Sequence, residues 1–337
     1  MSTETIKTRS EILFVYDIAD ANPNGDPNDE NRPRMDLESG RAKVSDVRLK
    51  RTIRDYLHDY KSETIFCWEI EKPDGTIQEG KDRAEDFFEK ISEDAKKRAA
   101  TVTQKRDLIQ KEVIKSCIDV RLFGATIPVS SGEKNKKGSS VTLTGAVQFA
   151  MGGSLHRVEP CFIKGTGAFA SGQGAQQRTF REEYVLPYAL IAFYGIVNQQ
   201  SAKATGLTSD DVEKLYEAIW YGTKNLITRS KMGHRPLLLL AVDYKSDHAN
   251  SYIGRLDRFL SVTSLDGKDS PRGEAIRDAG ELQLNFAELV TTLKARKEKI
   301  ERIRFAHDSR LPLSPAFEKK DEQFTFAGIS AKPFGFE

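Results

Sequence analysis

The chain has 337 residues and a mass of 37.8 kDa, with 38% hydrophobic and 30% charged residues. This composition is typical of a globular protein with an ionic surface, and it excludes a disordered tail or a fibre. Lys and Arg number 52 against 50 Asp and Glu, for a net charge of +2, and no apolar run approaches the roughly 18 residues that a membrane span needs.

The N-terminal third predicts a strand, a loop and a helix. The β-branched and aromatic stretch 11–20 predicts a buried strand that ends in the turn sequence N-P-N-G-D-P-N at 22–28. Ser45 is placed to cap a helix with an apolar face, while Lys50, Arg51 and Arg54 fall together on another face. We expect a further strand over 64–71 and a highly charged helical stretch over 82–118.

The rest of the chain alternates strands and helices. We expect strands over 119–129, 141–151 and 154–164, the last two joined as a hairpin at Gly152 and Gly153. A flexible basic loop is expected at 131–140. Further expected elements are a strand over 183–197, a helix from 209 or 210 to about 228, strands over 236–243 and 282–286, and a basic helix over 287–304.

Without the insertions, the order is strand, helix, strand, strand, helix, strand, the split βαβ order that ferredoxin-like folds and RNA-recognition modules share. We therefore predict an α+β, ferredoxin-like fold in a single elaborated domain over 1–337. Its core covers about 9–72, 119–129 and 141–243, with a helical insertion over about 81–118 and a C-terminal extension over about 244–337.

The charges are unevenly distributed along the chain. Residues 17–38 contain seven acids and two bases, whereas 41–54 contain six bases and one acid. Most basic helix faces are simply solvated, but Lys50, Arg51 and Arg54 have few acids at neighbouring turns. Further basic clusters contain His156 and Arg157, and Arg229 and Lys231. Several basic sites on one protein favour a groove along a phosphate backbone.

A glycine-rich segment at 165–174 contains Gly165, Gly167 and one aromatic residue, Phe169, and is followed by a basic stretch with Arg178. The glycines would permit close approach to a polynucleotide while Phe169 stacks or wedges. A surface loop without such a role explains the composition equally well, so both interpretations stay open.

Motifs for metal, phosphate and catalytic chemistry are incomplete. The stretch from Asp20 to Asn31 begins like an EF-hand loop, but Asn31 replaces the closing Glu, and two prolines interrupt it. A P-loop and a complete dinucleotide fingerprint are missing. Asp26 and Asp29 are more often turn formers than metal ligands. We therefore predict no catalytic residue, no metal and no cofactor.

Several stretches strongly resemble the Cas-seven family, the RAMP-type backbone subunit of the CRISPR Cascade surveillance complex, with the Csh-type of subtype I-B most similar. They are the turn at 22–28 with R-P-R-M-D at 32–36, V-S-D-V-R-L-K-R-T-I-R-D-Y-L at 44–57, D-V-R-L-F-G-A-T-I-P at 119–128, T-G-A-V-Q-F at 144–149, G-T-G-A-F-A-S-G at 165–172, T-F-R-E-E-Y-V-L-P-Y at 179–188 and T-R-S-K-M-G-H at 228–234.

The resemblance implies a RAMP palm with a helical fingers insertion and a thumb loop. Copies would stack head to tail into a helical filament along crRNA, bind the guide and support target DNA recognition in antiviral defence. Partners would be a capping backbone subunit, the large and small subunits and a recruited helicase-nuclease.

The RNA-binding residues expected from the family match and the basic clusters are Asn22, Asn24, Lys50, Arg51, Arg54, His156, Arg157, Gly165, Gly167, Phe169, Arg178, Arg229 and Lys231. The expected protein is cytoplasmic and not an enzyme. The alternative is a metal-dependent ribonuclease or guide-processing enzyme that uses Asp26 and Asp29.

Overall fold

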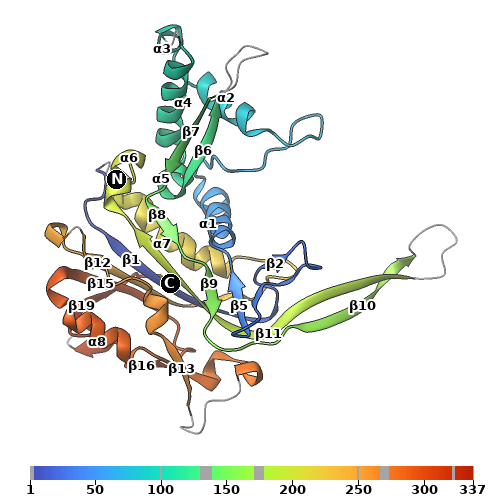
Figure 1. The fold of residues 1–337 in the computed structure, drawn as a ribbon, viewed down its shortest axis with the longest axis vertical. Coiled ribbons are helices and arrows are strands. Elements are labelled where there is room, and N and C mark those ends of the chain that lie inside the picture. The colour runs from blue at the N-terminus through green and yellow to red at the C-terminus, as the bar shows by residue number, and fades with distance from the viewer. Residues whose placement is uncertain are drawn as a thin grey trace. The chain divides into compact units, whose positions relative to one another are not determined.

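The computed structural model describes residues 4–98, 101–129, 139–170, 178–248, 250–265, 273–320 and 323–336, with backbone alone at 98, 139, 166–170, 178–181 and 264. The described residues form a mixed α/β fold with eight α-helices and one large sheet (Figure 1). The chain divides into two compact units. The helical unit comprises Met1–Arg9, Ile53–Gln148 and Val197–Ala218, and the sheet unit comprises Ser10–Thr52, Phe149–Ile196 and Ile219–Glu337.

The helices of the first unit pack around a small apolar core that contains Phe66, Phe87 and Val113. Thr101 and Gln104 form a reciprocal capping box, which explains where α4 begins. The helices of the described chain, of which α8 belongs to the sheet unit and α1 and α7 extend into it, are α1 (Asp46–Lys61), α2 (Gly80–Glu89), α3 (Glu93–Arg98), α4 (Val102–Ser116), α5 (Ile118–Phe123), α6 (Gln199–Thr205), α7 (Ser209–Lys224) and α8 (Ala287–Ala295). The antiparallel strands β6 (Gly124–Val129) and β7 (Ser139–Thr144) complete this unit.

The sheet unit is built around β1 (Ser10–Ala21), which lies between β12 (Arg235–Tyr244) and β11 (Arg178–Val197). The large sheet has the order β17-β18-β19-β15-β12-β1-β11-β9-β5-β4, and β8 and β10 also pair with β11. Its other strands are β4 (Met35–Asp36), β5 (Arg41–Val44), β8 (Val147–Phe149), β9 (Gly152–Ser154), β10 (Cys161–Ala170), β15 (Ile300–His307), β17 (Glu318–Lys320), β18 (Gln323–Phe326) and β19 (Ile329–Pro333).

Smaller sheets flank the large one. They contain β2 (Gly25–Asp26) with β3 (Arg32–Pro33), and β13 (Ser261–Ser264) with β14 (Leu282–Asn285) and β16 (Leu313–Ser314). The strands β10 and β11 form an antiparallel pair from Cys161 and Val185 outward. Figure 1 shows this pair as a narrow two-stranded arm that extends from the sheet.

One face of β1 is covered by the C-terminal part of the chain. Leu13 and Val15 belong to a buried cluster that also contains Leu256, Leu289 and Phe305. Because side chains alternate across a strand, both faces of β1 are buried here, which explains its nearly continuous apolar sequence.

Several predicted elements are confirmed. The strands at 11–20, 183–197, 236–243 and 282–286 correspond to β1, β11, β12 and β14, and the predicted helices that start near Ser45 and Ser209 correspond to α1 and α7. The charged stretch 82–118 is helical as three helices, α2, α3 and α4. The prediction of a single domain stays a prediction.

Two element predictions in the helical unit are wrong. Residues 64–71 form no strand beyond an isolated bridge at Glu71, because the carboxylate of Asp119 accepts hydrogen bonds from the amides of Phe66 and Cys67 instead. The predicted strand 119–129 begins as helix α5, and only β6 is extended. The basic loop predicted at 131–140 lies mostly outside the described residues.

Two further predictions fail in the sheet unit. The helix predicted over 287–304 ends at Ala295, and residues from Ile300 onward form β15, which pairs with both β12 and β19. Gly152 and Gly153 are not a hairpin turn. They lie in β9, which pairs with β5 and β11, while the hairpin forms between β10 and β11.

Gly152 is required by close packing. A Cβ atom at this position would lie 2.7 Å from the ring of Phe193, whereas a Cβ at Gly153 would lie 3.5 Å from the nearest atom, the carbonyl oxygen of Ala42. We expect Gly152→Ala to destabilise the protein by about 1–3 kcal/mol through overpacking. Gly153→Ala is the matched control and should change stability by less than about 1 kcal/mol. Urea unfolding of both variants measures this, and equal midpoints would contradict it.

Candidate nucleic-acid interface

The two asparagines of the first loop hold the loop itself. Asn22 is only 2% exposed, and its Nδ2 donates to the carbonyl oxygen of Asn31 at 2.7 Å. The Oδ1 of Asn24 accepts a hydrogen bond from the amide of Ser45 at 2.8 Å, next to the start of α1. Their contact with RNA is still a prediction, but both side chains position the loop.

This loop meets two other segments that are far from it in the sequence. The three segments are the first loop (22–32), the loop 225–234 before β12, and the base of the β10–β11 arm at Glu183 and Tyr184. The amide of Asn22 donates to the carbonyl oxygen of Ser230 at 2.8 Å. Arg229 Nη2 lies 3.1 Å from Glu183 Oε2. We call this arrangement the three-segment junction.

Arg32 joins the first loop to the arm. Its Nη2 donates to the hydroxyl of Tyr184 at 2.9 Å, and its guanidinium lies 4.5 Å from the centre of the Tyr184 ring. The same nitrogen is 2.9 Å from Glu30 Oε2. A stacked and paired guanidinium fixes the planar ring more firmly than a single hydrogen bond does. The base of the arm is thus tied to the loop.

Arg48, Lys231 and His234 lie close to one another at the junction, whereas Arg229 is paired with Glu183 and Arg32 with Glu30. Burial lowers the pKa of Lys231, and the charge of Arg48 lowers it further. Burial, together with Arg48 and Lys231, also lowers the pKa of His234 to about 3, so this imidazole is neutral at neutral pH. Like charges that depress one another's proton affinity are stabilised when an anion binds beside them. Arg48 and Lys231 are therefore the cations of the junction that are suited to a phosphate group.

The basic face of α1 is less available than its sequence indicates. Lys50 Nζ forms an ion pair with Asp46 Oδ2 at 2.9 Å. Arg54 Nε lies 3.0 Å from Asp119 Oδ2, and the Arg54 side chain is only 13% exposed. Arg51 is exposed. Arg54 therefore neutralises a fully buried carboxylate. Because Asp119 is 65 positions away, the acids at neighbouring helical turns do not reveal this partner.

The acids of the first loop have local partners. Asp26 Oδ2 pairs with Arg34 Nη1 at 2.9 Å, and its Oδ1 accepts from the amide of Asn28. Asp29 lies 3.8 Å from Arg32. Within the described residues, no group of three or more His, Cys, Asp or Glu side chains is arranged to hold a metal ion.

The glycine-rich segment belongs to the arm. Gly165, Gly167 and Phe169 lie in β10, and Arg178 begins β11 opposite Ala170. Residues 165–170 of the glycine-rich segment are thus in a strand, and residues 171–174 lie outside the described residues, as do the side chains of Phe169 and Arg178. Nearer the base, the rings of Phe162 and Tyr184 lie 5.0 Å apart.

His156 and Arg157 differ sharply in environment. His156 is buried, its Nε2 accepts from the amide of Leu190 at 3.2 Å, and its Nδ1 faces the carbonyl oxygen of Gly273 at 2.9 Å. Burial lowers its pKa, which favours this neutral form. Both ring nitrogens are occupied, so His156 has a structural role. Arg157 is exposed and pairs with Glu274 at 3.0 Å.

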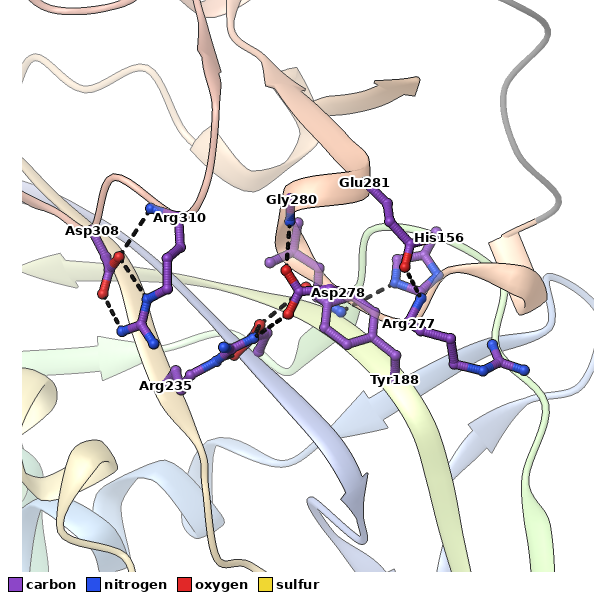
Figure 2. Close-up of polar contacts among 11 residues, drawn as sticks. His156, Tyr188, Arg235, Arg277, Asp278, Gly280, Glu281, Asp308 and Arg310 are labelled. Carbon is purple, nitrogen blue, oxygen red and sulfur yellow. Dashed lines mark hydrogen bonds and ion pairs between the residues drawn. The ribbon is translucent and has the colours of Figure 1, made fainter. Parts of the chain in front are cut away.

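The sheet face that RNA-recognition modules use for stacking bases is covered here. Asp17 accepts hydrogen bonds from Tyr188 and Arg235, and Arg235 also pairs with Asp278 at 3.1 Å. Figure 2 shows Arg235 bridging to Asp278 beside Tyr188, with a second pair formed by Asp308 and Arg310. The pair between Arg235 and Asp278 holds C-terminal residues against the sheet, whereas Asp308 and Arg310 are only two positions apart and form a local pair.

Glu11 secures the same covering segment. Its buried carboxylate accepts hydrogen bonds from the hydroxyls of Tyr194 and Tyr244 and from the amides of Ile253 and Gly254, both at 2.7 Å. A buried carboxylate with four donors is fully satisfied. The face above β1 is consequently occupied by protein, and we take the three-segment junction as the candidate interface.

Sequence reasoning missed Arg32, Arg48 and Tyr184 as parts of the site. Arg48 precedes Arg51 and Thr52 by about one helical turn, and this spacing indicates that Arg48 lies near them on one face of α1. The contact between Arg32 and Tyr184 spans 152 positions, and single-sequence patterns contain no signal for it. None of the described helices is long and apolar enough to cross a membrane.

Comparison with known proteins gives one consistent result. The family model described as CRISPR-associated protein Cas7 matches residues 8–309. A CRISPR-associated protein Cas7 of Haloferax volcanii is 31% identical over 322 residues, which cover 92% of this chain and 89% of that protein.

A chain of a solved structure is similar in fold. A chain of a "CRISPR RNA-guided surveillance complex, pre-nicking" has a TM-score of 0.52 at 14% identity, covering 97% of this chain and 96% of that one. A chain of a "CRISPR RNA-guided surveillance complex" has a TM-score of 0.43 at 14% identity, covering 92% and 95%.

Proposed function

Because this chain belongs to the CRISPR-associated protein Cas7 family, we propose that it is a backbone subunit of a type I CRISPR Cascade complex that binds crRNA. The family named from the sequence motifs is thereby confirmed, whereas subtype I-B is part of the proposal. The protein would polymerise head to tail along the guide in the cytoplasm and support target DNA recognition without catalysing a reaction.

The observation that carries the proposal is the three-segment junction. Arg48 and Lys231 lie close together where the first loop meets the base of the arm, and Arg229 pairs with Glu183 at the same place. Phosphate contacts supply affinity without reading sequence, and base pairing then reads the target. A subunit that binds guides of any sequence needs phosphate contacts for affinity and base pairing for specificity.

The fold supports the finer parts of the proposal. The order β12-β1-β11-β9, with α1 after β1 and α7 before β12, matches the strand order of a ferredoxin-like palm. In this interpretation the helical unit contains the fingers, and the β10–β11 arm is the thumb. The exposed Phe162 and Ile163 on the arm are apolar surface suited to contact with a guide.

Partner subunits also belong to the proposal. A head-to-tail interface between copies does not close on itself and so generates a helical filament. Capping, large and small subunits and a helicase-nuclease would complete the assembly. A ribonuclease that uses Asp26 and Asp29 is less favoured, because Asp26 is engaged by Arg34 and two-metal cleavage needs several convergent ligands.

Replacing Arg229 and Lys231 together by Gln is expected to weaken RNA binding and flatten its salt dependence. Each lost single-strand phosphate contact changes the slope of log K against log salt by about 0.7, so two contacts change it by about 1.4. Titration of the full chain with poly(U) at several salt concentrations measures the slope. The control replaces Lys320 and Lys332, exposed lysines of β17 and β19. Equal slopes for a folded variant and the wild type would contradict the assignment.

A further inference from the structure

A second basic site lies in the sheet unit, apart from the residues of the three-segment junction. It is a cavity of about 450 Å³. Its floor is formed by β5, β9 and β11, and its wall by residues 255–260, which include a short 3-10 helix, Leu256–Phe259. The volume lies within the range of small-ligand sites, roughly 300–1,000 Å³.

The cavity carries an excess of positive charge. Arg41, Lys43, Arg255 and Arg258 line it, against two acids, Asp36 and Asp257. Arg255 is paired with Asp257 through two hydrogen bonds of 2.9 and 2.5 Å, and Lys43 lies 3.7 Å from Asp36. With the residues that the structure describes, Arg41 and Arg258 form no ion pair. Arg41 and Arg258 therefore line the cavity without a counterion from the described residues.

The wall that carries Arg258 is held in place rigidly. The carboxylate of Glu11 binds the amides of Ile253 and Gly254 just before it. Arg255 adopts a left-handed conformation, with φ of 49° and ψ of 54°, which is uncommon for a residue other than glycine. Such backbone strain persists only where surrounding contacts enforce it, and it concentrates at functional sites. The position of Arg258 beside β5 is thus preorganised.

The lining indicates the chemistry of the ligand. Guanidinium groups bind phosphate oxygens through paired hydrogen bonds. The cavity is lined by Met151, Leu155 and Leu260 but by no aromatic residue on which a base could stack. It also lacks the aromatic anchor typical of a protein interface centre. The site therefore suits a sugar-phosphate backbone better than a nucleobase or an acidic protein segment.

We propose that Arg41 and Arg258 bind phosphodiester groups of a nucleic-acid strand in this cavity, in addition to the phosphates bound at the three-segment junction. This inference rests on the proposed function, since it assigns a second set of phosphate contacts to the same protein. The strand is either the guide RNA or the DNA that the guide recognises, and both present the same phosphodiester chemistry.

The test replaces Arg41 and Arg258 together by Gln in the full chain. Poly(U) is titrated against the protein alone, and single-stranded DNA complementary to a bound guide is titrated against the protein–guide complex, each at several salt concentrations. Loss of two phosphate contacts should flatten the slope of log K against log salt by about 1.4 in one titration. A change with poly(U) assigns the guide backbone, and a change only with DNA assigns the DNA strand.

Two control variants make the result specific. Replacing Arg41 and Arg258 by Lys retains both charges and should retain most of the slope. Replacing Lys320 and Lys332 by Gln removes two charges outside the cavity and should leave the slope unchanged. If the Gln variant is folded and its slopes equal those of the wild type in both titrations, the inference is overturned. It is also overturned if the Gln variant loses self-association while both slopes stay unchanged. A wild type that binds neither polymer would overturn this inference and the proposed function together.

Discussion

Asp119→Ala is expected to destabilise the helical unit by about 3–5 kcal/mol, because it leaves the nearly buried charge of Arg54, the buried amide of Phe66 and the partly buried amide of Cys67 without their partner. The Asp119 carboxylate is fully buried and accepts from Arg54 Nε at 3.0 Å and from the amides of Phe66 and Cys67 at 2.8 and 3.1 Å. The carboxylate therefore supplies hydrogen-bond acceptors that a neighbouring strand would otherwise supply to residues 64–71.

The measurement is the shift of the urea unfolding midpoint of the full chain at constant m-value. Glu85→Ala is a suitable control, because Glu85 pairs with Lys105 at 2.9 Å in a partly exposed position and such pairs contribute about 0–1 kcal/mol. If Asp119→Ala costs no more than Glu85→Ala, the assignment of Arg54 to a structural role is wrong.

His234 is expected to make the protein sensitive to acid. Its native pKa is about 3, whereas an unfolded histidine titrates near 6.5. The unfolded chain therefore binds more protons between these values, so the stabilisation is complete above about pH 6.5 and is lost as the pH falls toward 3. The full shift corresponds to roughly 5 kcal/mol at about 1.36 kcal/mol per pH unit.

Comparison with His234→Gln isolates this contribution. The free energy of unfolding of the wild type should fall more steeply below pH 6.5 than that of the variant, whose side chain does not titrate. His156, whose pKa is also lowered by burial, remains in both proteins and cancels in the difference. Parallel stability curves between pH 7 and pH 4 would show that His234 is not held neutral by the junction.

Local patterns were sufficient for the elements whose sequences and surroundings agree. The apolar run of β1 is buried on both faces, and α1 begins beside Ser45, whose hydroxyl accepts from the amide of Arg48. In contrast, the residues from Ile300 contain charges that suggested a helix. The pairing of β15 with two strands decides their conformation, and a local window contains no information about those partners.

The residues of the candidate site were predictable only in part from the sequence. Arg229 and Lys231 were identified from charge clustering, and both lie at the three-segment junction. Arg54 was chosen by the same criterion, but its partner Asp119 is 65 positions away. Charge patterning alone cannot distinguish a cation that faces solvent from one that neutralises a buried acid, because the difference arises only from tertiary contacts.

Sequencing of RNA that copurifies with the protein from its native host tests the central claim most directly. A crRNA-binding backbone subunit should retain RNAs of defined length that contain CRISPR repeat-derived ends and spacer sequences, with little preference among spacers. This enrichment should decline in the variant in which Arg229 and Lys231 are replaced by Gln. Recovery of general cellular RNA without repeat-derived guides, or of no RNA, would contradict the account.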